Sequence, residues 1–330
     1  MKAGKISEAQ CKRSVLKLLP EDSDRVLQGA GIGNDYAMLQ MGGSQRLATA
    51  MATCTLNTGH PARYAFSRAC NKLATGGSRP LAIMAGIWLP ARGNEDRIKD
   101  VIKELAALCT EAGIDYIGGH TELLEELRTP IIAVTVYGES LHTEPTDAAQ
   151  KVQAGESLVM LGYAGLEATA MLLQDRWEEL HSRYAESYLY AAKTLTARLD
   201  LWKELIKLSP QMITYIHDCS TGGVFAALWE IGEAAGCGIE VGIRQIPIRQ
   251  ETIEVCEYFD VNPYMALSGG SAIVVTKEPE PVIRQMAELG LNAAVIGHTT
   301  GMNDRIITNE DDNRYLTPPK GDDIYKIYRN

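Results

Sequence analysis

The chain has 330 residues, of which 45% are hydrophobic and 22% charged, an ordinary globular composition with enough material for about two domains. Its formal net charge is −10 at pH 7, and an acidic surface repels phosphodiester backbones and anionic lipids, so we expect neither a nucleic acid nor a membrane as a partner. Residues 1–20 lack the pattern of a secretory signal, and the 7 cysteines form no Cys-x-x-Cys pair, which predicts a reduced protein of the cytoplasm.

The first half of the chain is predicted to combine strands with two long helices. An amphipathic helix over 5–19 ends at Pro20, and a glycine-rich stretch, Gly29–Asp35, leads into the first strand. The clearest helix is 95–112, because its apolar side chains recur on one face and Gly113 can end it. We expect, in chain order, strands at 36–41 and 46–53, a helix at 61–74, a strand at 81–89, the helix at 95–112, and strands at 114–117 and 130–137.

The second half is predicted to repeat a scheme of strand, helix, strand and glycine loop. Residues 139–151 are polar and contain Pro145, so we place the boundary between two domains, 1–147 and 148–330, in this stretch. The chain from residue 302 onward is polar, and we expect it to be extended or loosely ordered. We expect, in chain order, a strand at 157–161, helices at 166–180 and 182–207, a strand at 213–216, a helix at 224–235, strands at 239–243 and 272–276, a helix at 280–289 and a strand at 294–296.

The stretch Tyr116–Glu122, Tyr-Ile-Gly-Gly-His-Thr-Glu, is the feature around which we expect a binding site to be organised. Gly118 and Gly119 follow an apolar strand, and adjacent glycines let the backbone adopt positive φ or approach a ligand closely. Polar side chains follow at once, at His120 and Thr121. A strand that delivers such a loop is a common support for a binding site, so we favour a site role for His120 over that of a satisfied polar residue.

The spacing Gly29-x-Gly31-x-Gly33 resembles a dinucleotide-binding turn, but that fingerprint needs a helix that opens inside it. A strand and a Gly-Gly turn are predicted here instead, which argues against that fold. No Gly-x-x-x-x-Gly-Lys-Ser/Thr pattern occurs, which excludes a P-loop kinase. Asp35, just before the strand, has two interpretations: a turn-forming residue, or a ligand of Mg²⁺, which prefers carboxylate oxygens.

The segment His217–Gly223, His-Asp-Cys-Ser-Thr-Gly-Gly, joins a predicted strand to a predicted helix. Neighbouring side chains on a strand point to opposite faces, so His217 and Cys219 would share a side, and a Cys–His nucleophile is one interpretation. The free N–H groups at the start of the helix form a plausible cradle for a phosphate. Ser268–Ser271, Ser-Gly-Gly-Ser, is a second candidate loop. These patterns indicate an anionic ligand but no particular reaction.

Five segments resemble, in order, the motifs of the aminoimidazole ribonucleotide (AIR) synthetase family, which includes selenophosphate synthetase, thiamine-monophosphate kinase and the hydrogenase maturation protein HypE. The family motifs are Gly-Asp-Asp-Ala-Ala, Asn-Asp-Leu-Ala-x-x-Gly-Ala-x-Pro, Gly-Gly-Asp-Thr, His-Asp-x-x-x-Gly-Gly and Ser-x-Gly. The matching segments here are Gly33–Ala37, Asn71–Pro80, Gly118–Thr121, His217–Gly223 and Leu267–Gly270. The form Gly-Gly-His-Thr-Glu resembles the HypE-like, AIR synthase-related branch.

The resemblance implies an α+β fold of two domains. The N-terminal domain, 1–147, would contribute a four-stranded sheet that pairs with a second subunit into a dimeric barrel, and the C-terminal domain, 148–330, would be an α/β sandwich. ATP would lie in a groove at the dimer interface, with Mg²⁺ and acidic loops on its phosphates. The shared chemistry is phosphoryl transfer, often to an amide or carbonyl oxygen. The implied partners are a second copy, a small phosphorylated ligand and a hydrogenase maturation protein.

The resemblance also assigns candidate residues by position. Asp35 is the implied metal ligand, and the catalytic candidates are His120, Lys72, His217 and Asp218. The residues implied to bind the nucleotide are Gly33, Asp35, Asn71, Lys72, Gly118, Gly119, His120, Thr121, Gly222, Gly223, Ser268 and Gly269.

Departures from the family pattern affect the metal ligands most. The family's acidic residues come from four places, of which Asp35 alone is matched. No Asp occurs within 46–64, and Lys72 and His120 stand where the pattern has Asp. We therefore expect Mg²⁺–ATP to bind weakly, because too few carboxylates remain to balance divalent charge. HypE also uses a C-terminal cysteine that accepts a carbamoyl group, and the last cysteine here is Cys256, so we expect that route to be closed.

Two hypotheses of different classes follow. In the first, the protein is an ATP-using or nucleotide-binding enzyme in which Lys72 supplies positive charge to phosphate in place of a metal. In the second, it is a non-catalytic dimeric binding or assembly protein, related to hydrogenase maturation, that has lost the metal site. The intact glycine loops favour retained ligand binding.

Overall fold

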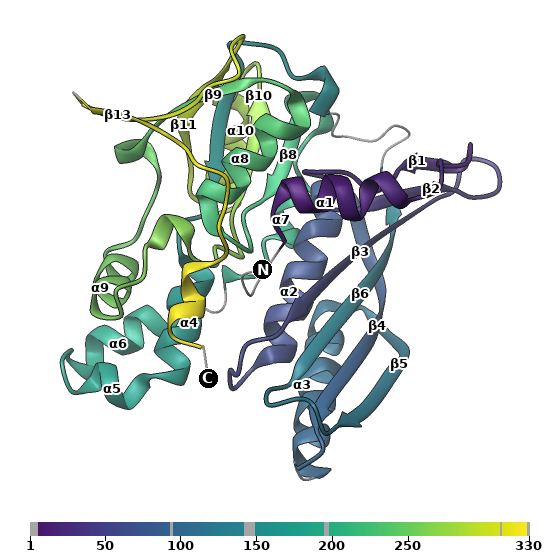
Figure 1. Ribbon diagram of the computed structural model, residues 1–330, viewed down its shortest axis with the longest axis vertical. Coiled ribbons are helices and arrows are strands. Elements are labelled where there is room, and N and C mark those ends of the chain that lie inside the picture. Colours follow the sequence, from purple (N-terminus) through teal and green to yellow (C-terminus); the bar gives the residue numbers. More distant parts are fainter. Residues whose placement is uncertain (1–5, 93–94, 142–148, 195–197, 311, 329–330) are drawn as a thin grey trace.

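The computed structural model describes residues 6–92, 95–141, 149–194, 198–310 and 312–328 (Figure 1). It contains two β-sheets, each packed against helices, in the α+β, two-domain arrangement that the resemblance implied. The predicted domain boundary falls in 142–148, outside the described residues, and stays a prediction. Within the described ranges, no helix combines the length and the apolar character needed to cross a membrane.

The first sheet has the strand order β1-β2-β3-β6-β4-β5. Its strands are β1 (Val26–Gln28), β2 (Ala37–Gln40), β3 (Arg46–Cys54), β4 (Ser78–Pro90), β5 (Asp115–Leu124) and β6 (Ile131–Ser140). Neighbours are antiparallel except β4 and β5, which are parallel because α3 (Glu95–Ala112) carries the chain back between them. The expectation of four strands is therefore wrong: β1 and β5 each add a strand at one edge of the sheet.

One face of this sheet is covered by α2 (Pro61–Thr75) and α3, which confirms the helices predicted at 61–74 and 95–112. Side chains alternate along β4, so Ile83 and Ile87 point toward the helices and are fully buried. Leu73 of α2 and Leu105 of α3 complete this layer and are also fully buried.

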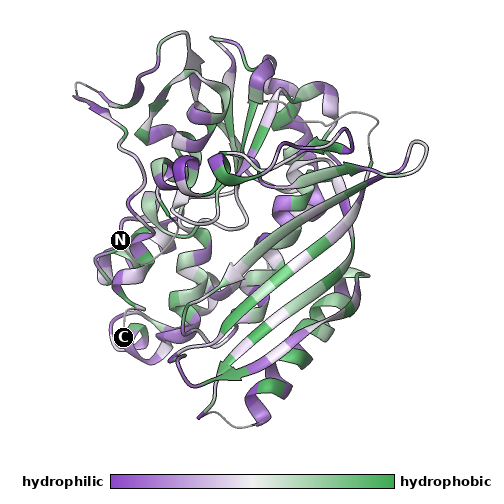
Figure 2. Ribbon diagram, turned by 45° about the vertical axis from the view of Figure 1, so that its right-hand side comes forward, coloured by the Kyte–Doolittle hydropathy of each residue, from purple (hydrophilic) through white to green (hydrophobic). Residues whose placement is uncertain are grey.

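The opposite face of the first sheet is open to solvent and largely apolar (Figure 2). Met84, which alternates with the buried residues of β4, is exposed, and so is Ile117 of the edge strand β5. The exposed large apolar side chains of β3, β4 and β5 on this face are Met51, Leu81, Met84 and Ile117. We call this surface the open sheet face.

The second sheet has the strand order β13-β12-β9-β11-β7-β10-β8. Its strands are β7 (Ser157–Leu161), β8 (Tyr215–Asp218), β9 (Gly238–Gly242), β10 (Ala272–Thr276), β11 (Ala293–Thr300), β12 (Arg305–Asn309) and β13 (Asp312–Tyr315). All neighbours are antiparallel except β9 and β12. The hairpin β12–β13 lies in the chain that we expected to be extended or loosely ordered, so that expectation is wrong for these residues.

Helices cover both faces of the second sheet. Leu158 and Met160 of β7 pack in the cluster that contains α8 (Gly223–Ala235). Val159 and Leu161 point the other way, into the cluster that contains α4 (Leu166–Asp175) and α10 (Pro279–Glu288). The predicted helices at 224–235 and 280–289 are confirmed, while α9 (Gln250–Tyr258) was not predicted.

The two helices expected at 166–180 and 182–207 are wrong in extent. The chain forms α4, α5 (Trp177–His181), α6 (Glu186–Lys193) and α7 (Trp202–Leu205), with 195–197 outside the described residues. Arg176 leaves the helical region with φ −123° and ψ 28°, and Ala185 is extended with φ −63° and ψ 140°. Neither break has a proline or glycine to mark it, so the local sequence carries no signal for them.

The N-terminal helix is also shorter than the expected 5–19. Helix α1 (Glu8–Ser14) starts with a capping box between Ser7 and Gln10, and a single 3₁₀ turn, Leu16–Leu18, follows it. A hydrogen bond joins helix α1 to α8: Trp229 donates from Nε1 to Oε2 of Glu8 at 2.9 Å.

Candidate functional site

A cavity of about 260 Å³, here called the central cavity, lies where the two halves of the chain meet. The first half contributes the loop Gly31–Asp35 and Lys72 of α2, and the second half contributes His217 of β8 and the start of α8. The two ends of the described chain also line it, through α1 and through Pro319, Gly321 and Asp322. Two glycine loops that the sequence singled out, at 29–35 and 217–223, therefore meet at one place.

The loop before Asp35 can approach α8 because Gly33 has no side chain. Gly33 has φ +80°, and a Cβ there would lie 2.7 Å from the Cβ of Ala234 and 2.8 Å from the hydroxyl oxygen of Tyr215. The next element is strand β2, with no helix, so the structure agrees with the exclusion of a dinucleotide-binding turn.

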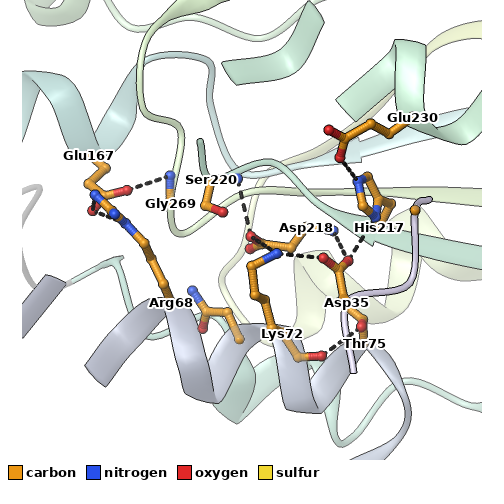
Figure 3. A network of polar contacts seen from close by, with 12 residues as sticks. Asp35, Arg68, Lys72, Thr75, Glu167, His217, Asp218, Ser220, Glu230 and Gly269 are labelled. Carbon is orange, nitrogen blue, oxygen red and sulfur yellow. Dashed lines mark hydrogen bonds and ion pairs between the residues drawn. The ribbon is translucent and has the colours of Figure 1, made fainter. Parts of the chain in front are cut away.

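Five charged side chains form a buried network beside the cavity (Figure 3). The Nζ of Lys72 lies 2.6 Å from Oδ1 of Asp35 and 3.5 Å from Oδ2 of Asp218. His217 lies between two acids, with Nδ1 2.8 Å from Oδ2 of Asp35 and Nε2 2.9 Å from Oε2 of Glu230. We call these residues the Lys72 network.

The electrostatics of this network hold Asp35 and Lys72 in their charged forms. Burial disfavours the carboxylate of Asp35, but His217 and Lys72 outweigh burial and lower its pKa. Burial likewise opposes the ammonium, yet Asp35 and Asp218 raise the pKa of Lys72. For His217, burial is outweighed by Asp35 and Glu230, which raise its pKa to about 9.

Asp218 is the least satisfied member of the network. Burial raises its pKa, against the opposing charge of Lys72. Its Oδ2 accepts a hydrogen bond from the N–H of Ser220 at 3.2 Å. Its Oδ1 is buried and has no hydrogen-bond partner among the residues that the structure describes.

Magnesium does not fit this set of residues. Both oxygens of Asp35 are engaged, Oδ1 by Lys72 and Oδ2 by His217 and by the N–H of Asp218 at 2.8 Å, and its side chain is only 2% exposed. The ammonium of Lys72 already supplies a positive charge next to the carboxylate. No group of three or more His, Cys, Asp or Glu suited to a metal ion occurs among the described residues. The metal role expected for Asp35 therefore has no support in this geometry.

Three other predicted binding residues, Asn71, Ser268 and Gly269, form hydrogen bonds within the fold. Asn71 is fully buried, donates from Nδ2 to the carbonyl of Leu199 at 2.8 Å and accepts at Oδ1 from the N–H of Trp202 at 2.9 Å. Ser268 accepts from the N–H of Gly165 at 2.8 Å and donates to the carbonyl of Ala266. These bonds connect elements of the fold.

Gly269 takes part in a buried ion pair between the two halves. Its N–H donates to Oε2 of Glu167 at 3.2 Å, and the guanidinium of Arg68 lies 2.7 Å from Oε1 of the same carboxylate. The pair joins α2 to α4, so Gly269 also serves the packing of the two halves.

The stretch Tyr116–Glu122 does not form the expected loop. Strand β5 runs through it as the edge of the first sheet, and its register against β4 shifts between Tyr116 and Gly118. Gly119 has φ +154°, and a Cβ there would lie 1.9 Å from the carbonyl oxygen of Ala85. The glycines therefore allow a bulge beside β4. In the sequence alone, glycines that permit a bulge cannot be told from glycines that permit a ligand to approach closely.

Tyr116 packs against the core, and the residues from Ile117 to Glu122 are exposed to solvent, away from the central cavity. Among the described residues that line the cavity, none comes from Gly118–Thr121. The side chain of His120 is 66% exposed, and its Nε2 lies 3.3 Å from Oε2 of Glu122. A ligand role for these residues stays a prediction, and it requires a second copy to approach β5.

Cys219 is a poor nucleophile in this structure. It lies in the hydrophobic cluster under α8, and burial raises the pKa of its thiol well above the usual value. The imidazole of His217 is held by two acids, Asp35 and Glu230. The Cys–His interpretation therefore has no support here.

Sequence reasoning missed several residues that the structure brings to the cavity. Glu230 is 13 positions from its partner His217, and no motif links them. Trp229 and Cys11 also line the cavity, as does Asp322 from the tail. The segment Pro319–Asp322 is short and polar, and a pattern of this kind gives no sign of burial.

The family of the chain follows from the comparison with known proteins. The model of the AIR synthase related protein N-terminal domain matches residues 33–140, and that of the C-terminal domain matches residues 153–308. The chain belongs to the AIR synthase-related family. The resemblance seen in the five motifs is thereby confirmed, and the matched segments contain Gly33–Asp35 and His217–Gly223 of the two glycine loops at the cavity.

Within this family the chain is most usefully compared with HypE proteins. It is 27% identical over 233 residues to the carbamoyl dehydratase HypE of Rhodobacter capsulatus, which covers 69% of this chain and 66% of the relative. The structure resembles that of a HypE–HypF complex, with a TM-score of 0.72, 16% identity and coverage of 94% of this chain and 100% of the other. It also resembles a HypE in complex with ATP, with a TM-score of 0.66, 19% identity and coverage of 86% and 88%. At these identities the structural likeness shows the fold alone.

Proposed function

We propose that this HypE-like, AIR synthase-related protein binds ATP or another phosphorylated ligand in the central cavity, without Mg²⁺. The observation that carries the proposal is the position of the Lys72 ammonium, 2.6 Å from Asp35 beside the cavity. A fixed cation there offsets the acidic residues that would otherwise require a metal before an anion could approach.

The charge balance of the Lys72 network supports metal-free binding. Lys72 and His217 carry positive charge against three carboxylates, Asp35, Asp218 and Glu230, so they offset two of the three negative charges without a metal ion. Lys72 is the only lysine or arginine among the described residues that line the cavity. Its side chain is 22% exposed, so its ammonium can contact both its acids and a ligand.

The rest of the lining suits a phosphorylated ligand with an apolar part. Thr221 and Gly222 place the start of α8 at the cavity, where backbone N–H groups and the helix dipole favour an anion. The N–H of Gly222 is hydrogen-bonded here to the carboxylate of Asp322. Ile32, Met51 and Trp229 offer apolar surface to a nucleobase or a similar ring. The likeness to a HypE crystallised with ATP supports a nucleotide as the first ligand to test.

The reaction implied by the family, phosphoryl transfer to an amide or carbonyl oxygen, would use this chain's own charges. Such transfer depends on positioning and on neutralising charge at the transferred group. We propose Lys72 for that neutralisation and His217 for orienting Asp35. We propose no carbamoyl dehydratase activity, the activity named for the relatives, because this chain departs from the family pattern at Lys72 and His120.

Calorimetric titration of ATP into the protein, with Mg²⁺ or with EDTA, tests the proposal. We expect the same Kd in both buffers and at least about a tenfold loss of affinity in Lys72→Ala. The double variant Asp35→Asn with Lys72→Met keeps the charge balance and controls for misfolding, while Lys99→Ala removes an exposed lysine of α3. Binding that requires Mg²⁺, or equal affinity in Lys72→Ala, would contradict the proposal.

A second candidate function is a dimeric binding or assembly protein without catalysis, and the open sheet face favours it. The face carries exposed apolar side chains on three strands of one sheet, β3, β4 and β5, and a second copy could bury them by pairing sheet against sheet, as the barrel of the family implies. A HypE–HypF complex among the similar structures also makes a maturation partner reasonable. A folded dimer with no affinity for ATP in either buffer would favour this candidate.

The cellular setting is also proposed. The seven cysteines are all free thiols in the structure, which suits the cytoplasm. We further propose that the domains divide at residue 147, between the last strand of the first sheet and the first strand of the second.

A further inference from the structure

The carboxylate of Asp322 occupies the start of α8. Its Oδ2 accepts a hydrogen bond from the N–H of Gly222 at 2.6 Å, and its Oδ1 accepts from the N–H of Leu267 at 3.3 Å and of Ile324 at 3.0 Å. The N–H of Gly222, the N-cap of a helix of thirteen residues, is one of the groups at which a phosphate was expected to bind.

The backbone around this carboxylate allows an oxyanion to come close to its N–H groups. Gly222 has φ +86° and Gly223 has φ +68°, conformations that other residues rarely adopt. A Cβ on Gly223 would lie 2.7 Å from the carbonyl oxygen of Ala266. The two glycines therefore hold the start of α8 against the 266–267 backbone, so that two separate segments direct N–H groups at one carboxylate.

Asp322 is held there without a direct cationic partner in the described chain. Its side chain is buried, and the hydrogen bonds that it accepts all come from backbone N–H groups. Burial raises the pKa of Asp322 to about 7, although the N–H groups of Gly222 and Ile324 and, less strongly, Arg68 favour its charged form. A carboxylate with so little compensation is one that a better anion can replace.

The size of the central cavity points the same way. At about 260 Å³ it lies just below the roughly 300–1,000 Å³ of ordinary ligand pockets, so it is small for a nucleotide in this state. Pro319, Gly321 and Asp322 all line it, so moving this segment would both enlarge the cavity and free the N–H of Gly222.

We propose that the segment 317–328 is an internal competitor of the ligand, in which the Asp322 carboxylate stands where a phosphate group binds. The structure is then the closed, self-occupied state, and a phosphorylated ligand displaces Asp322 from the N–H groups of Gly222 and Leu267. This inference rests on the proposed function, because it concerns the same cavity.

The competing explanation is that Asp322 only anchors the tail to the fold. Both explanations predict some loss of stability when the carboxylate is removed, but only competition predicts a gain in affinity. In Asp322→Asn the negative charge is lost and one of the two oxygens becomes an NH₂ group, so the side chain can no longer accept on both sides. Its hold on the N–H groups of Gly222 and Leu267 is therefore weakened with little change in size.

The experiment is titration of pyrophosphate and of ATP into the parent, Asp322→Asn and the control Asp323→Asn. Asp323 is the neighbouring residue, and its carboxylate contacts Asn262 and Lys326. We expect Asp322→Asn to bind pyrophosphate about tenfold more tightly than the parent, and Asp323→Asn to bind it like the parent. Equal affinity in all three proteins would overturn the inference and leave the proposed function standing. No binding by any of them, for either ligand, would overturn both.

Hydrogen exchange of the parent gives a test that needs no variant. Saturating pyrophosphate should speed exchange of the backbone N–H of Ile324, Tyr325, Ile327 and Tyr328, whose bonds hold this segment in place. Unchanged or slower exchange in this segment, with pyrophosphate bound, would show that the tail stays in place and would overturn the inference.

Discussion

The ammonium of Lys72 lies 2.6 Å from the carboxylate of Asp35, which precedes it by 37 residues in the chain. Asp35 is 2% exposed, and Lys72 also lies 3.5 Å from Asp218. A lysine therefore stands beside the acid that the family pattern associates with a metal. We therefore expect an anionic ligand at this site to meet the ammonium of Lys72 rather than a metal ion.

Removing Lys72 should destabilise the protein strongly. Lys72→Ala leaves Asp35 and Asp218 buried without their cation, and we expect a loss of about 3–5 kcal/mol in the free energy of unfolding. Urea unfolding of Asp35→Asn, of Lys72→Met and of the variant that combines these two substitutions would give a coupling energy above about 1 kcal/mol. The exposed pair Lys99 and Glu95, at 3.1 Å, is the matched control and should give less than about 0.5 kcal/mol. A coupling as small as that of the control would contradict the prediction.

The stability should fall with pH where His217 titrates. Its pKa is raised from 6.5 to about 9, so between these values the folded protein binds more protons than the unfolded chain. The contribution is therefore complete below pH 6.5 and is lost as the pH rises through 9, by roughly 3 kcal/mol in all. Urea unfolding at pH 6 and pH 9.5 should show a smaller decline in His217→Gln than in the parent. The exposed His120→Gln should behave like the parent, and an equal decline in all three proteins would refute the assignment.

Cys11 offers a chemical probe of the central cavity. It lines the cavity and is partly exposed, whereas Cys237 is also partly exposed but is not among the described lining residues. Bound ATP should slow the alkylation of Cys11 by iodoacetamide at least about fivefold, because it blocks access to the thiol. Peptide mass spectrometry would follow both thiols, and the rate at Cys237 should stay the same. Protection at both cysteines, or at neither, would place the ligand elsewhere.

Gly119 should matter for folding, while Gly118 beside it should matter less. A Cβ at Gly119 would lie 1.9 Å from the carbonyl oxygen of Ala85, whereas nothing lies within 4 Å of a Cβ at Gly118, and both have positive φ. Both alanine variants carry the backbone strain, so their difference isolates the clash, and we expect Gly119→Ala to be about 2–4 kcal/mol less stable than Gly118→Ala. Thermal and urea unfolding would measure this. Equal stability would mean that the bulge in β5 adapts.

The open sheet face should mediate dimer formation if a second copy covers it. Ile117 and Met84 are 59% and 39% exposed on this face. Ile117→Lys places a charge where the two sheets would meet, so light scattering should find a dimer for the parent and a monomer for the variant. Met302→Lys changes an apolar residue that is 69% exposed on a turn of the second half, and it should remain dimeric. A monomeric parent would count against the barrel.

The sequence by itself determined the elements whose signals are local. The period of apolar residues located α2, α3 and α8, and the sequence order of the glycine motifs identified the family. Each helix pattern and each single motif lies within about twenty residues, which is the range over which helix periodicity and turn chemistry act.

Only the tertiary structure decided what those motifs do. Lys72 and Asp35 are 37 residues apart, Asp218 and Asp35 are 183 apart, and Gly222 and Asp322 are 100 apart. No local pattern specifies such pairs, because they form when the two sheets pack and a buried charge must find a partner. The same reason explains Gly118 and Gly119: the sequence marks an unusual backbone there, and the contact with β4 determines that it is a bulge.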